Sequence, residues 1–299
     1  MRQASIFFIL LFFYISAMTQ YTPLYDHIPN YTECTNKENI LQANGILRIS
    51  NISKPGYQFF KAKDDKKKRP CIIVCPGGGY SIVAAQHEGT DVAKYLNEMG
   101  LNVLLLKYRL PDSLCQVNKS IAPLQDVQQA MYLARRNSKE WGIKSNQIGI
   151  MGFSAGGHLA ASLSSHYMDI KIENKEGLSL RPDFQILIYP VISFKDFGHP
   201  GSRTRLIGTN PSEADLNYFS NENHVNRKTP KTFIVHAKDD KTVPVKNAEI
   251  YDEALRKNKV ASFLFLFEKG GHGFGLINKT SEQQWPEMLK NWLIKQKIL

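Results

Sequence analysis

Residues 149–158 read GIMGFSAGGH and contain the pattern G-x-S-x-G, with Gly152, Ser154 and Gly156 in its three fixed places. The run before the pattern is apolar, as in a buried strand, and residues 155–166 after it are typical of a helix. A serine between such a strand and helix lies in a very tight turn with strained backbone angles. The residues two positions before and after it must lack side chains so that the strand and the helix can approach each other. We therefore predict that Ser154 is a nucleophile, held at a helix start whose free N–H groups favour a developing oxyanion.

Apolar runs alternate with helical patterns on both sides of this turn. The runs are mostly apolar throughout, as expected for parallel strands that are buried on both faces. Predicted strands cover residues 71–75, 102–107, 147–151, 184–189, 232–236 and 262–267, and predicted helices cover 90–99, 122–137, 155–166, 245–258 and 282–297. The alternation predicts an α/β protein with a doubly wound, mostly parallel sheet and helices on both faces. Residues 45–51 and 56–62 are expected to pair through a turn at 53–56 and form its antiparallel edge.

One interval, residues 192–231, breaks the alternation. It is rich in Gly, Pro, Ser and Asn, and only residues 211–218 are expected to form a short helix within it. Long loops inside compact domains are usually functional, and this one follows a strand whose carboxyl end faces the catalytic side. We predict a rim or a small lid of the active site, the alternative being a surface loop without function.

Length and charge restrict the classes of protein that fit. The chain has 299 residues, a length that suits one large α/β domain or two small ones, and 42% hydrophobic and 22% charged residues are ordinary for a soluble globular protein. The formal net charge is +11, but apart from a run at 66–69, next to two aspartates, the basic residues are scattered. A solvated turn explains that run better than a nucleic-acid site, so no nucleic-acid partner is expected.

The first residues are typical of an export signal. Arg2 precedes an apolar run at 6–15, and the small residues Ser16 and Ala17 follow it. We predict a signal peptide at residues 1–19 and a single catalytic domain at 20–299, in a secreted or periplasmic protein with no stable membrane span after cleavage. An uncleaved membrane anchor is the alternative.

Four cysteines permit up to two disulfides in an exported chain. Cys71 and Cys75 lie four residues apart on one strand, too far apart to bridge, so we expect two buried thiols. A bond between Cys34 and Cys115 can form, but nothing in the sequence requires it.

The partners that a reactive serine needs are present in the expected chain order. A serine hydroxyl requires an imidazole to take its proton and a carboxylate to orient that imidazole. Asp239 and Asp240 follow one of the last two predicted strands, and His272 follows the other in a glycine-rich loop. We choose Asp240 as the orienting acid and expect Asp239 to be a salt-bridging surface residue. The predicted triad is Ser154, Asp240 and His272.

The remaining histidines lack such a loop after a strand. We expect His158 to form a local hydrogen bond rather than to react, because it lies on the helix that follows Ser154. Structural or surface roles are expected for the whole group, which comprises His87, His158, His166, His199, His224 and His236.

A second glycine-rich loop, PGGGY at residues 76–80, follows the strand at 71–75. Without side chains, its backbone N–H groups can reach a carbonyl oxygen. We predict an oxyanion hole made by Gly78 or Gly79 together with Ala155. Tyr80 and Phe274 are predicted to contact the substrate, and neither a metal nor an organic cofactor is required.

Taken together, these motifs resemble those of secreted α/β-hydrolase carbohydrate esterases, and of bacterial acetylxylan-esterase-like proteins in particular. The resemblance extends from about residue 45 to the end. It is carried by PGGGY at 76–80, KYRL at 107–110, GFSAGGH at 152–158, HAKDD at 236–240 with VP at 243–244, and GGHGF at 270–274. Residues 202–203, 206–208 and 219–225 are also similar. Cys75 before the triple glycine and Ala237 in place of a glycine depart from the family.

The resemblance implies the α/β-hydrolase fold and removal of acetyl groups from hemicellulose, with Ser154, Asp240 and His272 as the triad. It also implies Gly79 and Ala155 as oxyanion donors and an acetylated polysaccharide or oligosaccharide as the substrate. The sugar, the acyl group and the oligomeric state stay open. The alternatives are a general carboxylesterase, a peptidase of the same fold, and a non-catalytic carbohydrate-binding protein on a hydrolase scaffold.

An arginine and an aspartate are candidates for an ion pair on the basis of residue type alone. Arg109 and Asp126 could pair beneath the site, and the alternative is two separate charges that face solvent.

Overall fold

The computed structural model describes residues 21–35, 37–43, 46–63 and 67–299. The signal peptide predicted at residues 1–19 lies outside these ranges. Within them, no helix combines the length and the apolar character that crossing a bilayer would need.

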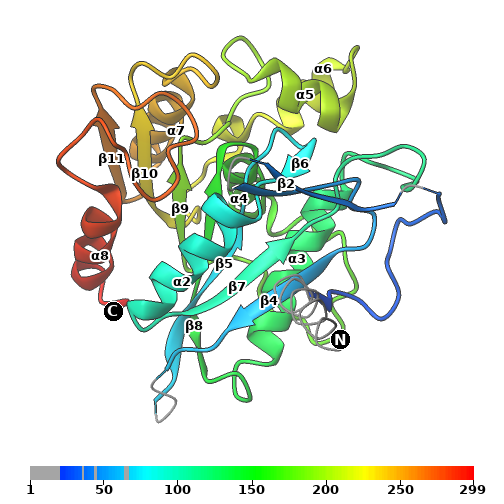
Figure 1. The fold of residues 1–299 in the computed structure, drawn as a ribbon, viewed down its shortest axis with the longest axis horizontal. Helices are drawn as coiled ribbons and strands as arrows, with labels where there is room; N and C mark the ends of the chain where they lie inside the picture. The colour runs from blue at the N-terminus through cyan, green and yellow to red at the C-terminus, as the bar shows by residue number, and fades with distance from the viewer. Residues whose placement is uncertain (1–20, 36, 44–45, 64–66) are drawn as a thin grey trace, which may run out of the picture.

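The core of the protein is an eight-stranded sheet (Figure 1). In spatial order its strands are β1 (Thr22–Pro23), β4 (Gly56–Phe60), β7 (Asn102–Lys107), β5 (Arg69–Cys75), β8 (Ile143–Phe153), β9 (Phe184–Ile188), β10 (Lys231–Ala237) and β11 (Ser262–Phe267). The six strands from β7 to β11 are parallel, whereas β1 and β4 are antiparallel to their neighbours. The predicted doubly wound, mostly parallel sheet is confirmed.

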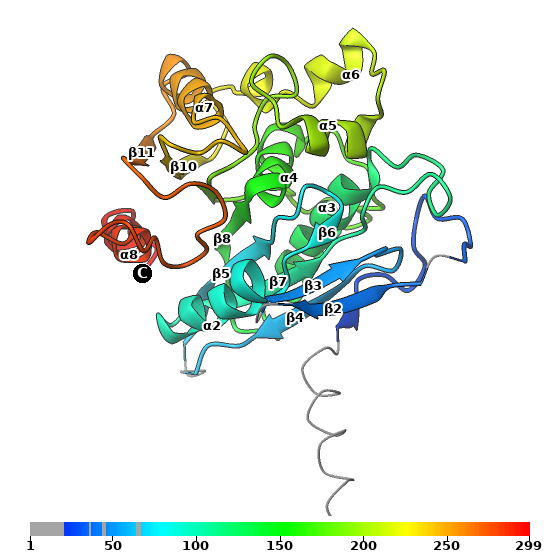
Figure 2. The same cartoon turned by 45° about the horizontal axis from the view of Figure 1, so that its top comes forward.

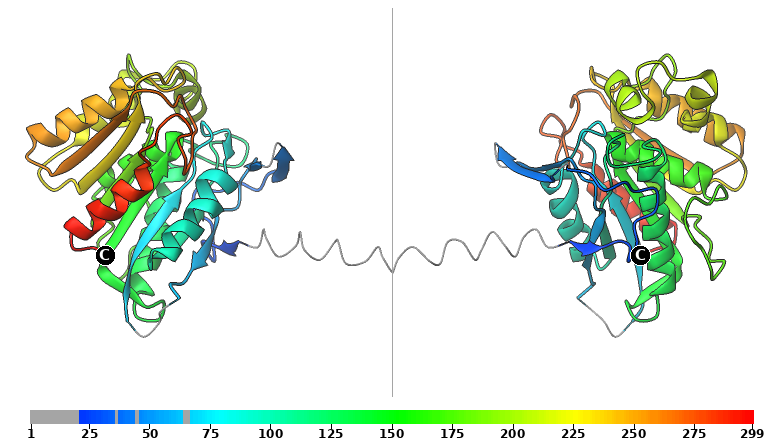
Figure 3. Two further views of the ribbon diagram at one scale, coloured as in Figure 1. Left: turned by 60° about the vertical axis from the view of Figure 1, so that its left-hand side comes forward. Right: turned by 90° about the vertical axis from the view of Figure 1, so that its right-hand side faces the viewer.

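Helices cover both faces of this sheet (Figure 3). One face packs against α2 (Asp91–Glu98) and α8 (Trp285–Lys295), and the other against α3 (Ala122–Arg136), α4 (Ser154–His166) and α7 (Lys246–Lys257). Successive strand residues belong to opposite cores: Ile186 and Ile188 lie in the core that includes α2 and α8, and Leu187 lies in the core that includes α3, α4 and α7. This alternation explains why the strands are mostly apolar on both faces.

The predicted pairing of residues 45–51 with 56–62 is wrong. Strand β3 (Ile46–Ser50) instead pairs with β2 (Asn39–Ala43) and with β6 (Ile82–Val83) in a separate antiparallel sheet. Figure 2 shows this small sheet lying beside the main one. Strand β4 enters the main sheet without β3 and lies there between β1 and β7, antiparallel to both.

The interval at residues 192–231 forms α5 (Pro200–Ile207), α6 (Glu213–Tyr218) and the 3-10 turn η2 (Asn221–His224). We call these residues the lid segment. The short helix expected at 211–218 corresponds to α6, and α5 was not predicted. Helix α5 begins at Pro200, and the side chain of the preceding residue, His199, caps its first turn. Gly208, whose φ is 91°, follows the last residue of the helix. Figures 1 and 2 show α5 and α6 at the end of the sheet toward which β5 and β8 run.

The four cysteines divide into two kinds. Cys34 and Cys115 form a disulfide that links residues 81 positions apart. Cys71 and Cys75 are free and buried on β5, and burial raises the pKa of both thiols well above the usual range.

Arg109 and Asp126 form a buried ion pair, so the alternative of two solvent-facing charges is wrong. Nη2 of Arg109 lies 2.8 Å from Oδ1 of Asp126, and both side chains are fully buried. The Arg109 backbone N–H also donates to Asp126, at 2.7 Å, and Nη1 donates to the carbonyl of Pro29. The pair therefore ties the segment after β7 to α3 and to the N-terminal part of the chain.

Replacing Asp126 by Asn is expected to lower the free energy of unfolding by about 3–5 kcal/mol, because the Arg109 charge would stay buried without its partner. Urea unfolding of purified protein measures the change. The exposed pair Lys175–Glu173 offers a control, since Glu173→Gln should change stability by less than about 1 kcal/mol. Equal stability of Asp126→Asn and the unmodified protein would show that the pair has no structural role.

Candidate active site

Ser154 lies at the junction of β8 and α4, in the strained turn that the sequence predicts. Its φ is 51°, an angle that non-glycine residues rarely adopt. A methyl group on Gly152 would lie 2.0 Å from the carbonyl oxygen of Gly156, and one on Gly156 would lie 2.1 Å from that of Cys75. Both positions therefore require glycine, and the turn holds Ser154 against the end of β5.

The structure brings Ser154, Asp240 and His272 together. Nε2 of His272 lies 2.9 Å from Oγ of Ser154, and Nδ1 lies 2.6 Å from Oδ2 of Asp240. Since the carboxylate can only accept, Nδ1 carries the proton and Nε2 is left to accept from the serine hydroxyl. This arrangement prepares the serine for attack on an electrophilic carbon.

Asp240 is held in its ionised form by several donors. Its Oδ1 accepts from the backbone N–H groups of Thr242 and Val243, both at 2.9 Å. Burial alone would raise the pKa of Asp240, but the hydrogen bonds from His236 and His272 outweigh it and lower the pKa well below the usual range. The carboxylate thus stays charged and can stabilise an imidazolium at position 272.

His236 takes part in this network. The sequence predicts only a structural or surface role for this residue. Its Nε2 lies 3.2 Å from Oδ2 of Asp240 and 2.9 Å from the carbonyl oxygen of Val243, and the residue is fully buried. Both neighbours are acceptors, so Nε2 carries the proton and donates to them. The only signal in the sequence is the spacing of four residues between His236 and Asp240.

The predicted oxyanion donors lie next to the nucleophile. A methyl group on Gly77 would lie 2.9 Å from Cβ of Ser154, so the PGGG loop passes directly against the elbow. Among the described residues, no protein acceptor takes the backbone N–H of Gly79 or of Ala155. In the same part of the chain the N–H of Gly78 also has no protein acceptor, while its carbonyl accepts from Ser81 and Ile82, so both glycines remain candidate donors. The free donors of Gly79 and Ala155 match the needs of a tetrahedral oxyanion.

A buried carboxylate, Glu88, links the two glycine-rich loops. Its Oε2 accepts from the N–H of Gly77 at 2.8 Å, and its Oε1 accepts from the hydroxyl of Tyr189 at 2.8 Å. That hydroxyl in turn accepts from the N–H of Gly275, and the Tyr189 ring lies 4.9 Å from the ring of His272. Glu88 and Tyr189 therefore position both loops, a role that no spacing in the sequence indicates.

Three residues named from the sequence lie at the margin of this site. The Tyr80 side chain is only 2% exposed, and its hydroxyl bonds to His158, so that hydroxyl is not available to a substrate. Phe274 is half-buried and packs edge-on against Tyr189. Substrate contact by the Tyr80 and Phe274 rings stays a prediction. Asp239 is exposed and accepts from the N–H of Gly271, a hydrogen bond in place of the expected salt bridge.

Two histidines of α4 hold the lid segment. His158 donates from Nε2 to the carbonyl of Phe219 at 2.8 Å, and His166 donates to that of Tyr218 at 2.9 Å. Burial is the main reason why the pKa of each histidine is lowered to about 4. Both are therefore neutral at neutral pH and anchor the end of α6.

These histidines should make stability depend on pH. An unfolded histidine titrates near pH 6.5, so between about 6.5 and 4 the unfolded chain binds more protons than the folded one. Their contribution is complete above the unfolded pKa and is lost as the pH falls toward 4, by up to about 1.4 kcal/mol per pH unit for each histidine. Urea unfolding at pH 7, 6 and 5 measures the slope. His166→Gln should make the slope shallower, and an unchanged slope would contradict the assignment.

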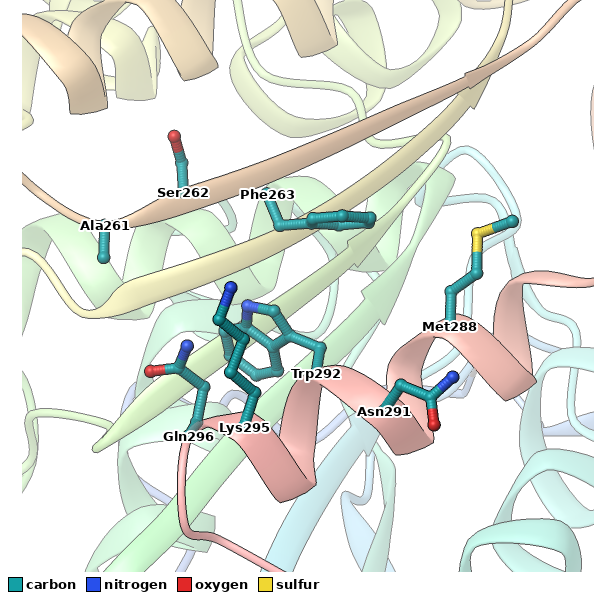
Figure 4. Close-up of a pocket in the computed structure, with 8 residues that line it drawn as sticks. All are labelled: Ala261, Ser262, Phe263, Met288, Asn291, Trp292, Lys295 and Gln296. Atoms are coloured by element: carbon teal, nitrogen blue, oxygen red, sulfur yellow. The ribbon is translucent and has the colours of Figure 1, made fainter.

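A pocket elsewhere on the molecule does not belong to this site. It has a volume of about 480 Å³ and lies between β11 and α8 (Figure 4). Phe263 and Trp292 line it, together with Met288 and Lys295 from α8. None of its lining residues is a member of the triad or of the two glycine-rich loops, so the chemistry described above lies elsewhere.

The chain matches one protein family and is similar to several known proteins. Residues 58–255 match the BD-FAE family. The chain is similar to endo-1,4-beta-xylanase B of Butyrivibrio fibrisolvens, with 36% identity over 83% of this chain and 39% of that protein. It is 35% identical to the acetylxylan esterase of Xylanibacter ruminicola over 74% of this chain and 45% of that protein. The chain therefore spans less than half the length of these two curated relatives.

A solved structure matches over nearly its whole length. The acetyl ester-xyloside bifunctional hydrolase from Caldicellulosiruptor lactoaceticus shares 36% identity at a TM-score of 0.78, over 94% of this chain and 97% of that one. The family match covers most of the sheet together with Ser154 and Asp240, and the solved structure extends the likeness to most of the chain. The resemblance to acetylxylan-esterase-like α/β-hydrolases is thus confirmed, and the chain belongs to the BD-FAE family.

Proposed function

We propose that the protein is a serine esterase that hydrolyses acetyl or other short acyl esters on plant polysaccharide such as xylan. The observation that carries the proposal is the continuous hydrogen-bonded path from Asp240 through His272 to Oγ of Ser154, with distances of 2.6 and 2.9 Å. All three members of the triad are present, which favours a catalyst over a carbohydrate-binding protein that keeps only the scaffold.

The mechanism follows from the positions of these atoms. Oγ of Ser154 attacks the acyl carbon while its proton passes to Nε2 of His272, and the oxyanion accepts from the N–H groups of Gly79 and Ala155. His272 then gives the proton to the leaving alcohol oxygen, and an acyl-enzyme forms. Water attacks that ester with His272 as the base, and the carboxylic acid and Ser154 are released.

The substrate class is supported by the named relatives, which are a xylanase, an acetylxylan esterase and an acetyl ester-xyloside hydrolase. A general carboxylesterase of the same fold is the second candidate. We propose a secreted or periplasmic location, supported by the Cys34–Cys115 disulfide, which is typical of oxidising compartments.

The experiment measures acetate release from acetylated xylan, acetylated mannan and acetylated pectin, and so tests which polysaccharide is the preferred substrate. Acetylated xylan should be the fastest, and p-nitrophenyl acetate should be cleaved faster than esters with longer acyl chains. Cleavage of p-nitrophenyl acetate with no acetate released from any polysaccharide would favour the general carboxylesterase. No turnover of any ester would reject the esterase altogether.

A further inference from the structure

His199 is held in one orientation at the start of the lid helix α5. It is the N-cap of this helix, and its Nδ1 accepts from the backbone N–H of Ser202 at 3.2 Å. The Ser202 hydroxyl lies 2.8 Å from the same nitrogen, and Ser202 is fully buried. The ring is thus fixed by a capping contact rather than left to rotate.

This contact determines which ring nitrogen carries the proton. A nitrogen that accepts from a backbone N–H cannot itself be protonated, so the proton of the neutral ring is on Nε2. Burial, with a further effect from the nearby His272, lowers the pKa of His199, and the ring is therefore neutral at neutral pH. Among the described residues Nε2 has no hydrogen-bond partner, although His199 is half-buried.

The ring lies over the oxyanion loop. A methyl group on Gly79 would lie 3.8 Å from Cε1 of His199, the carbon between the two ring nitrogens. A groove of about 680 Å³ begins beside this loop at Tyr80 and Ser81 and runs along α5, where Thr204 and Arg205 line it. The residues that line this groove do not include His199. The His199 ring instead lies against the loop at Gly79, near enough to His272 and Asp240 for their charges to act on it.

We propose that His199 is a specificity residue, whose Nε2–H donates a hydrogen bond to the alcohol half of the ester. The inference rests on the proposed esterase function. The carbonyl oxygen of a bound ester is satisfied by Gly79 and Ala155, and an acetyl methyl group has no acceptor. The leaving alcohol oxygen faces His272 in the proposed mechanism. The acceptors that remain are the hydroxyl and ring oxygens of a sugar bound beside Gly79, against which the His199 ring lies.

His199→Asn is the sharpest test, because an Asn oxygen can replace Nδ1 as the helix cap but the side chain does not extend to Nε2. The ratio of kcat/KM for an acetylated xylo-oligosaccharide to that for p-nitrophenyl acetate should fall about 3- to 10-fold, as for the loss of one neutral hydrogen bond. His199→Gln restores an N–H at similar reach and should recover part of the ratio. The control is His224→Asn in the same lid segment, whose Nε2 is already bonded to the Asn217 carbonyl.

Binding provides a readout that needs no turnover. In protein inactivated by Ser154→Ala, adding His199→Asn should weaken the binding of the acetylated oligosaccharide about 3- to 10-fold in calorimetry. An unchanged Kd, or a kcat/KM ratio equal to that of the unmodified protein, would overturn the role of His199. If the unmodified protein cleaves no ester, the proposed function fails, and the binding measurement still decides whether His199 contacts the sugar.

Discussion

Ser154→Ala is expected to lower the turnover of an acetyl ester at least about 10³-fold. Oγ is the atom that forms the covalent bond, and without it only the oxyanion donors and substrate binding remain to assist water. The serine Oγ bonds to His272, and the φ of 51° belongs to the backbone, so the fold should not depend on the hydroxyl. The measurement is the hydrolysis of p-nitrophenyl acetate by purified protein.

Ser164→Ala on the same helix is the matched control, since this buried hydroxyl donates to the Ala160 carbonyl and lies outside the triad. It should keep activity within a few-fold of the unmodified protein. Circular dichroism and urea unfolding should show that Ser154→Ala is folded. A folded Ser154→Ala protein with full activity would exclude Ser154 as the nucleophile.

Asp240→Asn is expected to lower kcat about 10⁴-fold, because it changes the tautomer of His272. The backbone N–H groups of Thr242 and Val243 both donate to Oδ1, so an Asn would place its carbonyl oxygen there. Its NH2 group would then face Nδ1 of His272 at the position of Oδ2. The imidazole must accept at Nδ1 and carry its proton on Nε2, where it can no longer take the proton of Ser154.

Asp239→Asn provides the comparison for this variant. Asp239 is exposed, accepts from the N–H of Gly271, and could keep that bond through an amide oxygen. Its effect on kcat should be no more than a few-fold. A large loss for Asp239→Asn together with near-normal kcat for Asp240→Asn would reverse the choice between the two neighbouring acids.

The parallel sheet and the triad could be predicted because each leaves a local pattern. Strands buried on both faces form apolar runs, as residues 71–75 of β5 do, and helices such as α4 start at a recognisable turn. The triad is predictable from chain order, since each member follows a strand of a sheet whose carboxyl ends meet at one edge.

The remaining features depend on contacts between distant residues. Glu88 joins Gly77 to Tyr189, which lies 101 residues farther along the chain, and no periodicity marks such a pair. His199 is an uncommon helix cap, so α5 could not be recognised from its first residue. Tyr80 has a φ of 58° and its hydroxyl bonds to His158, 78 residues farther along the chain, and no local pattern marks that contact.

The central claim is that three distant side chains make one serine nucleophilic. A fluorophosphonate probe, which reacts with activated serines, followed by peptide mass spectrometry tests it most directly. The account predicts one adduct per chain, on Ser154, that is lost in Ser154→Ala and forms far more slowly in His272→Ala. Failure of the folded protein to react, or an adduct at another residue while Ser154 stays unmodified, would contradict it.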